Sequence, residues 1–320
     1  MIVSIIVLTY NSSDTIRQTL DSIIDQAALF GNEAEIIVGD DCSSDNTREI
    51  LTDYKNKYPQ LINLVFNSNN LGTVKNYFNL ISCCKGKYIM ECAGDDYWLP
   101  NKMNTQISYM EGHPEVGMCC GNAIRYYEDV DKYGLGLDIV PESVKFESLL
   151  FSNCIFAVTV CIRKNTILDY ISDVNPIEHN WIMEDYPIWL WISKNSSISY
   201  LDTYFCVYRF RMNSISHPNS VNKEIAFLDG TLDIRSFFSE NDEDRLIIER
   251  RYLLDKSEIY LKYNDVRNYR LMIKKTDCRW KRTKMFLSHL PGYAKFMKLI
   301  RRDNIRLFEN KELVLITKRK

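Results

Sequence analysis

The sequence predicts an α/β protein with a mainly parallel central sheet, followed by a helical C-terminal segment. Short apolar, β-branched runs alternate with segments of helical periodicity in the first part of the chain, which is typical of successive βαβ units. Polar clusters follow the first, second and fourth of these runs, as TYN, GDD and GDD. Because ligands of parallel sheets bind at the carboxyl ends of the strands, the pattern predicts a ligand site as well as a fold.

Five strands are expected in this first part because each run is short, apolar and bounded by polar residues. They cover Ile2–Leu8, Glu35–Val38, Leu61–Phe66, Lys87–Cys92 and Val116–Cys120. The helices between them carry apolar residues at helical spacing. These helices are expected around Ile16–Ile24, Thr47–Tyr58, Tyr77–Ile81 and Pro100–Met110.

The middle of the chain has a less regular pattern. We expect a loop or insertion at Tyr126–Pro141, a strand at Ala157–Arg163 and an aromatic-rich helix that includes Pro187–Ile192. From about Asn222 onward the pattern becomes helical and charged. The predicted organisation is therefore one α/β domain over residues 1–221 and a helical, basic segment over residues 222–320.

Charge is distributed unevenly along the chain. The 40 Lys and Arg and 42 Asp and Glu give a net charge of -2, yet residues 270–320 contain 16 Lys and Arg against 4 Asp and Glu. Such a basic end indicates an anionic partner. Its interleaved Trp, Met, Phe, Leu and Ile favour an amphipathic segment at an anionic membrane surface, with a solvated helix packed on the domain as the alternative. No nucleic-acid motif accompanies the charge, so nucleic acid is not expected.

The ten cysteines are expected to be reduced and mostly buried. Met1 is followed directly by the apolar run IVSIIVL, without the basic region or cleavage site of a signal peptide, and this run is too short to cross a bilayer. No CxxC pair occurs. These features predict a cytoplasmic protein, without structural disulfides.

Two pairs of adjacent acids end predicted strands. Asp40 and Asp41 close the second strand, where a carboxylate can accept the N3–H of uracil; capping of the following helix is the alternative. Asp95 and Asp96 close the fourth, where carboxylate oxygens suit Mg2+ or Mn2+ bridged to a substrate phosphate; a plain turn is the alternative. Adjacent carboxylates raise each other's pKa unless cations or hydrogen-bond donors compensate, so both pairs need an explanation.

A third acid pair lies in the aromatic run WIMEDYPIWLWI. Glu184 and Asp185 there predict a general base at the mouth of an aromatic pocket, since partial desolvation raises the pKa of a carboxylate. The alternative is a helix start with Pro187 just inside it, and the two interpretations are compatible. Other chemistries find no support, because HExxH, GxSxG, P-loop and GxGxxG patterns are all missing.

Three segments, taken in order, resemble the nucleotide-sugar half of family 2 glycosyltransferases, which have the GT-A fold. They are SIIVLTYNSSDTIRQTLDSIIDQ, EIIVGDDCSSDNT and NNLGTVKNYFNLISCCKGKYIMECAGDDYWLPNKM. The match is close over roughly the first third of the chain and thins to short motifs out to about Ser216. The resemblance implies an inverting transfer, in which an acceptor hydroxyl attacks the anomeric carbon of a nucleotide-sugar bound with Mg2+ or Mn2+.

The resemblance also implies which residues bind the donor. Thr9, Tyr10 and Asn11 match the loop against the nucleotide base, and Asp41 matches the carboxylate on uracil. Lys75 stands where the family usually has a basic residue near the nucleotide.

The metal motif of the family, Asp-x-Asp followed by a further Asp, is incomplete in this chain. Asp95 matches the metal-binding carboxylate, but Ala93 replaces the first Asp. The ribose contact of that missing acid would fall to Asp96, to the Gly94 backbone or to water.

The later motifs of the family supply the remaining expectations. Asp185 matches the catalytic base in the family's ED pair, and Arg211 in YRFRMNSIS replaces a frequent His and could contact the diphosphate. Trp98 and Trp189 either line the sugar or acceptor pocket or belong to the core. The QxxRW signature of processive synthases is missing, which favours transfer of a single sugar.

These observations predict transfer from a nucleotide-sugar, UDP-linked by the match at Asp41, to a glycan or lipid-linked acceptor in capsule or lipopolysaccharide-type synthesis. The enzyme would be cytoplasmic, with peripheral attachment at the inner face of the cell membrane. A non-catalytic sugar-nucleotide- or glycan-binding protein is the alternative that Ala93 leaves open. A nucleotidyltransferase would need a Gly- and Lys-rich signature near the N-terminus, and none is present.

Overall fold

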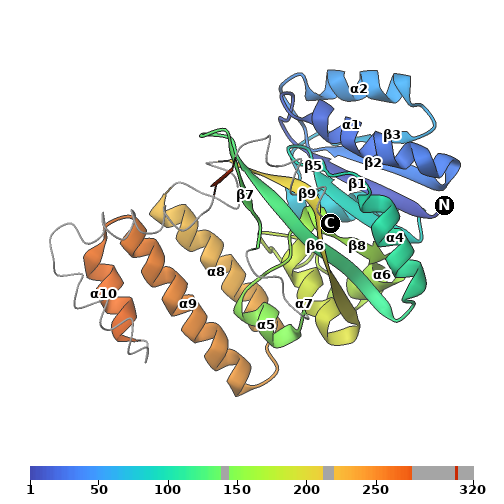
Figure 1. The fold of residues 1–320 in the computed structure, drawn as a ribbon. Coiled ribbons are helices and arrows are strands. Elements are labelled where there is room, and N and C mark those ends of the chain that lie inside the picture. The colour runs from blue at the N-terminus through green and yellow to red at the C-terminus, as the bar shows by residue number, and fades with distance from the viewer. Residues whose placement is uncertain (138–143, 212–219, 276–306, 309–320) are drawn as a thin grey trace.

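The computed structural model describes residues 1–137, 144–211, 220–275 and 307–308, and its centre is a ten-stranded sheet (Figure 1). Four strands of this sheet pair in parallel in the order β4-β1-β2-β3. They are β1 (Val3–Thr9), β2 (Ala34–Asp40), β3 (Ile62–Phe66) and β4 (Tyr88–Ala93). All four confirm strands expected from the apolar runs.

The second half of the sheet contains both strand directions. β8 (Cys161–Arg163) lies antiparallel between β4 and β6 (Val116–Tyr127), and β7 (Lys132–Leu135) pairs antiparallel with β6 and with β10 (Leu307–Phe308). Along its other edge β6 pairs in parallel with the long β9 (Ser197–Phe210), which also holds β5 (Tyr97–Trp98). The result is a curled, mostly parallel sheet that confirms the predicted α/β class.

Helices cover both faces of the sheet because successive strand residues point to opposite sides. Val3, Ile5 and Val7 pack in one core with α1 (Ile16–Ala27), α2 (Thr47–Lys57) and α4 (Lys102–Gly112). Ile6 lies in a second core on the other face, with α3 (Thr73–Cys83), α6 (Lys164–Val174) and α7 (Asp185–Asn195). Short 3-10 helices, η1 (Ala28–Glu33) and η2 (Ala157–Thr159), complete these layers.

The remaining helices form an array beside the sheet. Figure 1 shows α8 (Val221–Phe238), α9 (Asp242–Lys262) and α10 (Val266–Lys274) side by side, with α5 (Phe146–Phe151) between the array and the sheet. Three side chains of α8 and α9 (Ile234, Phe238 and Ile248) are buried in the same core as α7. The helical segment predicted from residue 222 therefore packs on the α/β domain through its first two helices.

Close contacts fix α8 against α7 and the segment that precedes it. Arg235 is buried, and its Nε donates a 2.9 Å hydrogen bond to the hydroxyl of Tyr186. A Cβ on Gly230 would lie 2.8 Å from Cδ1 of Ile182, so only glycine permits this approach. Glycine in a helix interior costs about 1 kcal/mol relative to alanine, and here the close packing explains its presence.

Two expectations for the middle of the chain were wrong. The predicted loop at 126–141 contains the end of β6 and all of β7, while residues 138–141 lie outside the described part. The predicted strand at 157–163 is a strand only from Cys161, because the Thr159 amide donates to the Phe156 carbonyl (2.9 Å) and closes a 3-10 turn, to which the Thr159 hydroxyl adds a second bond (2.7 Å). β7 escaped detection because KYGL is short, contains glycine and lacks an apolar alternation.

The nine cysteines in the described part of the chain are free thiols, and six of them are buried. No helix in the same part is both long enough and apolar enough to span a membrane. Most of the basic stretch from residue 270 lies outside the described residues, so the predicted membrane segment remains a prediction.

Candidate active site

The three polar clusters meet at one edge of the sheet, as their positions at strand ends predicted. Thr9 ends β1 opposite Asp40 in β2, and Leu8 lies opposite Ala93 in β4. Backbone hydrogen bonds continue past the strands, from the Asp41 amide to the Thr9 carbonyl (2.9 Å) and from the Gly94 amide to the Leu8 carbonyl (2.8 Å). The loops that follow β1, β2 and β4 therefore lie side by side.

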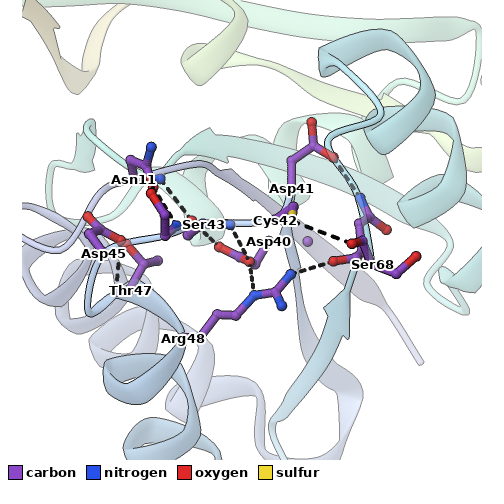
Figure 2. A network of polar contacts seen from close by, with 12 residues as sticks. Asn11, Asp40, Asp41, Cys42, Ser43, Asp45, Thr47, Arg48 and Ser68 are labelled. Atoms are coloured by element: carbon purple, nitrogen blue, oxygen red, sulfur yellow. Dashed lines mark hydrogen bonds and ion pairs between the residues drawn. The ribbon is translucent and has the colours of Figure 1, made fainter.

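Asp40 is a structural acid. It is completely buried and pairs with Nε of Arg48, while the Ser43 amide donates to its Oδ1 at 3.1 Å. The Ser43 hydroxyl donates to the other oxygen. Nη2 of Arg48 also donates to the Asn67 carbonyl (Figure 2). Asp40 therefore links the β2 turn, through Arg48, to α2 and to the residue that follows β3.

Asp41, the predicted uracil ligand, points away from Asp40 (Figure 2). Its Oδ1 accepts hydrogen bonds from the Leu71 amide (2.8 Å) and the Asn67 side chain (2.9 Å), and its Oδ2 accepts one from the Gly72 amide (2.9 Å). These bonds hold the loop before α3 in place. A carboxylate has about four acceptor positions, so Oδ2 retains one for a ligand.

The loop after β1 combines a buried hydroxyl with an exposed ring. Thr9 is 4% exposed, and its Oγ1 has no hydrogen-bond partner among the described residues. Tyr10 is 52% exposed. Asn11 adopts a positive φ of 51°, which its hydrogen bonds support: its amide donates to the Ser43 hydroxyl and its Oδ1 accepts from the Ser44 amide, both at 2.8 Å (Figure 2).

The turn after β4 is packed tightly against β1 and α1. A Cβ on Gly94 would lie 2.7 Å from Oγ1 of Thr9, so glycine is required at this position. The Gly94 carbonyl accepts hydrogen bonds from the hydroxyls of Thr15 (2.9 Å) and Thr19 (3.1 Å), and Thr19 also donates to the Asp96 carbonyl (2.7 Å). The Asp95–Asp96 turn is thereby fixed before any ligand binds.

Arg209 braces this turn from β9, and the sequence analysis missed its role. Its amide donates to Oδ1 of Asp96 (2.7 Å), its Nε to the Asp95 carbonyl (2.8 Å), and its Nη2 to Gln18 (2.8 Å). The only sequence signal was its place in YRFRMNSIS. Arg211, two residues on, forms a two-pronged ion pair with Glu128 (2.9 and 3.0 Å), which Arg209 also approaches at 3.4 Å.

The two acids of this turn remain poorly compensated. Burial raises the pKa of Asp95, although Arg211 and Arg209 oppose that rise. Burial and then the charge of Asp95 raise the pKa of Asp96 well above its usual range. Asp95 has no ion-pair partner within the part of the chain that the structure describes.

The chemistry of this turn fits a hard divalent cation, which would relieve the repulsion between the two carboxylates. Within the described ranges, however, no three His, Cys, Asp or Glu side chains are grouped to hold a metal ion. Protein oxygens at Asp95 would thus supply only part of a coordination shell, as is usual where substrate phosphates complete it. Lys75, the expected basic residue near the nucleotide, is exposed on α3.

A pocket of about 500 Å³ contains the third acid pair, and Thr73, which follows the Gly72 amide bound to Asp41, also lines it. Glu184 and Asp185 line it at the start of α7. Its other walls come from α3, β6, the residues before and within η2, the segment before α7, β9 and α8, through Thr73, Arg125, Asn153, Ile155, Phe156, Ala157, Ile182, Met183, Tyr208, Phe210 and Phe227. The expected aromatic pocket with an acid pair is therefore present, and α8 forms part of it.

Burial raises the pKa of both acids in the pocket. The pKa of Asp185 rises to about 6, because burial outweighs the hydrogen bond that its Oδ1 accepts from the Tyr186 amide (2.6 Å). The pKa of Glu184 rises to about 8 through burial and the nearby charge of Asp185. Behind them, Glu91 on β4 is buried, and its pKa is raised well above its usual range by burial and then by the charges of Glu184 and Asp185.

Neither candidate tryptophan lines the pocket. Trp98 is 3% exposed and packs in the core beneath α4, where the Lys102 ammonium lies 4.4 Å from its ring centre. Trp189 is completely buried in the opposite core. The core interpretation of both residues is the correct one, and Phe156, Tyr208, Phe210 and Phe227 are the aromatic residues of the pocket instead.

The fold is that of GT-A glycosyltransferases, and solved structures share the architecture. TarS of Staphylococcus aureus, solved with UDP-GlcNAc, superposes with a TM-score of 0.60 at 18% identity, over 85% of this chain and 79% of that one. The mannosyltransferase PcManGT of Pyrobaculum calidifontis, solved with GDP-Man and Mn2+, gives 0.55 at 13% identity, over 92% and 83%.

The sequence identifies the family. Residues 4–173 match the model of Glycosyl transferase family 2, and the chain belongs to this family. It is 28% identical to the Escherichia coli protein WfgD, a UDP-Glc:alpha-D-GlcNAc-diphosphoundecaprenol beta-1,3-glucosyltransferase, over 79% of this chain and 92% of that one. An uncharacterized Mycobacterium tuberculosis protein is 33% identical over 55% of this chain, and the match spans about half (51%) of that relative.

Proposed function

We propose that this protein transfers one sugar from a UDP-sugar to a hydroxyl of a glycan on a lipid diphosphate, with inversion at the anomeric carbon. The observation that carries the proposal is the acid pair Glu184–Asp185, which lines an aromatic pocket and has raised pKa values. Membership of Glycosyl transferase family 2 supports the reaction class, and the named activity of WfgD supports both donor and acceptor class.

Asp185 is the proposed general base. Its pKa of about 6 leaves it ionised at neutral pH yet basic enough to receive a proton. As the acceptor oxygen bonds to the anomeric carbon, its hydroxyl proton passes to Asp185, and the bond from that carbon to the diphosphate oxygen breaks and releases UDP. Glu184, with a pKa of about 8, carries a proton at neutral pH and limits the negative charge beside the base.

The loops after β1, β2 and β4 are the proposed donor site. Thr9, Tyr10 and Asn11 would contact the base, and the remaining acceptor position of Asp41 would take the uracil N3–H. Lys75 would approach the nucleotide from α3.

The turn after β4 would hold the diphosphate end of the donor. Asp95 would bind Mg2+ or Mn2+, which neutralises charge on a leaving diphosphate when bound. The Gly94 backbone, Asp96 or water would make the ribose contact of the acid that Ala93 replaces. The Thr9 hydroxyl, which has no hydrogen-bond partner among the described residues, offers one more group beside Gly94.

A lipid-linked acceptor places the proposed reaction at the cytoplasmic face of a membrane, in the synthesis of a surface polysaccharide such as a capsule or lipopolysaccharide. The basic stretch from residue 270 would then attach the enzyme to anionic lipid. The putative teichuronic acid glycosyltransferase TuaG of Bacillus subtilis, 28% identical over 67% of this chain, supports the polysaccharide context.

Release of UDP tests the proposal directly. The full chain is incubated with UDP-Glc, UDP-GlcNAc or GDP-Man, with Mn2+ or with EDTA, and with and without a GlcNAc-diphospho-lipid. We expect UDP release from one UDP-sugar only, dependent on metal and increased by the acceptor. Binding of that donor without release, with or without acceptor, would instead support the non-catalytic sugar-nucleotide-binding alternative.

A further inference from the structure

One cation of the pocket has no acidic partner. Arg125 projects from β6 into the pocket wall, and its guanidinium lies 5.6 Å from the ring centre of Phe156. Within the described ranges this ring is its single recorded partner, whereas Arg209 and Arg211 both pair with Glu128. A guanidinium that lines a pocket without a carboxylate loses hydration and gains no ion pair, unless a ligand supplies the anion.

The acids of the pocket do not neutralise Arg125. Burial raises the pKa values of both Glu184 and Asp185, and no cation is among the causes that act on either of them. No ion pair joins Arg125 to either carboxylate among the described residues. Arg125 and the two acids therefore line the same pocket of about 500 Å³ without pairing.

Side chains near Arg125 add a polar group and aromatic rings to this part of the pocket. Arg125 pairs with Tyr208 across β6 and β9, and Phe210 lies two residues further along β9 on the same face of the sheet. Asn153 also lines the pocket; its Oδ1 accepts from the Ile155 amide (3.0 Å), which leaves its two N–H donors available. An arginine and an amide donor beside aromatic rings suit an oxyanion attached to a sugar.

We propose that the acceptor of this enzyme carries an oxyanion close to its reactive sugar, and that Arg125 and Asn153 bind this group and thereby select anionic acceptors. The inference rests on the proposed function. Without Arg125, the ionised Asp185 in the same pocket would repel such an acceptor. Two sources have the required chemistry: the diphosphate that joins the acceptor sugar to its lipid, and the carboxylate of an acidic sugar in the glycan.

Binding of three matched probes tests the inference. They are GlcNAc-α-diphosphoundecyl, undecyl β-D-glucuronide and the neutral undecyl α-GlcNAc, each titrated into the full chain in the presence of UDP and Mn2+. We expect one anionic probe to bind at least about tenfold more tightly than the neutral one, since a charge-assisted contact contributes that much. The better anionic probe identifies the source of the oxyanion.

Variants assign the preference to Arg125. Arg125→Gln keeps a long polar side chain and should bind charged and neutral probes equally, while Arg125→Lys should retain part of the preference. Arg245→Ala is the control, because Arg245 is 68% exposed on α9 and should leave the preference unchanged. Melting temperatures are compared first, so that a loss of folding is not mistaken for a loss of binding.

The outcomes separate this inference from the proposed function. Equal binding of all three probes by the natural chain, or an anion preference that survives in Arg125→Gln, would overturn the role of Arg125. UDP release from a UDP-sugar without acceptor, measured in parallel, reports on the donor reaction alone. If UDP is released but anionic and neutral probes bind equally, the proposed transfer stands and the role of Arg125 is wrong. If anionic probes bind more tightly but no nucleotide-sugar releases UDP, the proposed transfer is wrong.

Discussion

The same tripeptide, Gly-Asp-Asp, stands at the end of β2 and directly after β4, and the two copies have opposite electrostatic settings. In the β2 turn, residues 39–41, Arg48 pairs with Asp40, and two backbone amides and an asparagine side chain donate to Asp41. In the β4 turn, residues 94–96, the carboxylate of Asp96 receives one amide, from Arg209, and Asp95 has no ion-pair partner among the described residues. Identical sequence therefore does not mean identical function.

The difference indicates which acids a bound ligand would stabilise and which are already stabilised by the protein itself. The acids of the β2 turn are stabilised by donors of the same chain, and most of their hydrogen-bonding capacity is used to hold loops together. The acids of the β4 turn, and likewise Glu184 and Asp185 in the pocket, are buried with too few compensating groups and have raised pKa values. Such groups gain most from a bound cation or a transferred proton.

Among substitutions that test this contrast between compensated and uncompensated acids, Asp185→Asn should have the largest effect. Loss of a general base should lower kcat by about 10²- to 10⁴-fold, with UDP affinity unchanged. In the natural enzyme, kcat/KM should rise with pH around the Asp185 pKa of about 6, because only the ionised carboxylate accepts the proton. Steady-state UDP release over a range of pH measures both, and Asp173→Asn on the exposed surface of α6 is the control. Turnover retained in Asp185→Asn would exclude this residue as the base.

Asp95→Asn tests the acid without a partner. Binding of UDP in the presence of Mn2+ should weaken at least about tenfold, since one charge-assisted contact is lost, while the melting temperature stays equal or rises because repulsion with Asp96 is relieved. Titration calorimetry with Mn2+ and with EDTA compares the variant with Asp53→Asn, a surface control on α2. Unchanged metal-dependent binding would contradict the assigned role.

Asp40→Asn tests the compensated acid and should have the reverse effect. Asparagine keeps one acceptor oxygen, but the charge that pairs with Arg48 is lost and an N–H group replaces the second acceptor, so we expect the free energy of unfolding to fall by about 2–3 kcal/mol. Urea denaturation measures the loss. UDP affinity of the folded fraction should be retained; a variant as stable as the natural protein would show that the ion pair contributes little.

The smallest expected effect concerns Glu91→Gln. The native protein keeps the proton on Glu91 to a higher pH than the unfolded chain does, so native Glu91 binds more protons and stability falls as pH rises above the usual glutamate pKa. Glutamine removes this dependence, so the variant should be more stable than the natural protein at pH 8, with no gain at pH 4. Melting temperatures at both pH values decide; a variant less stable at pH 8 would contradict the expectation.

The sequence predicted the part of the site that is local in the chain. The five early strands and the three polar clusters at their ends were correctly placed, because a parallel sheet brings the ends of β1, β2 and β4 together whatever the loops contain. Glu184–Asp185 was likewise found from its aromatic neighbours and its place at a helix start. Such features depend on residues within a few positions of one another.

Contacts distant in sequence could not be predicted in the same way. Arg209 reaches the Asp95–Asp96 turn across more than 100 residues. Arg125 on β6 lines one pocket with Glu184 and Asp185 at the start of α7. The two tryptophans show the converse: both stood next to acid pairs in the sequence, yet packing buried them in opposite cores. The backbone sets the face on which each side chain lies, and the elements packed on that face decide whether the side chain is buried.

The sequence by itself determined the α/β class, the edge of the sheet where the polar clusters lie and the family to which the chain belongs. Only the tertiary structure decided which of the paired acids are compensated by the protein and which remain available to a ligand. Whether a carboxylate is compensated depends on donors that arrive from other elements, such as Arg48 and Gly72 for the β2 turn and Arg209 for the β4 turn. Electrostatic interactions act through space and depend on burial, so identical Gly-Asp-Asp sequences became a structural turn in one place and a candidate metal site in the other.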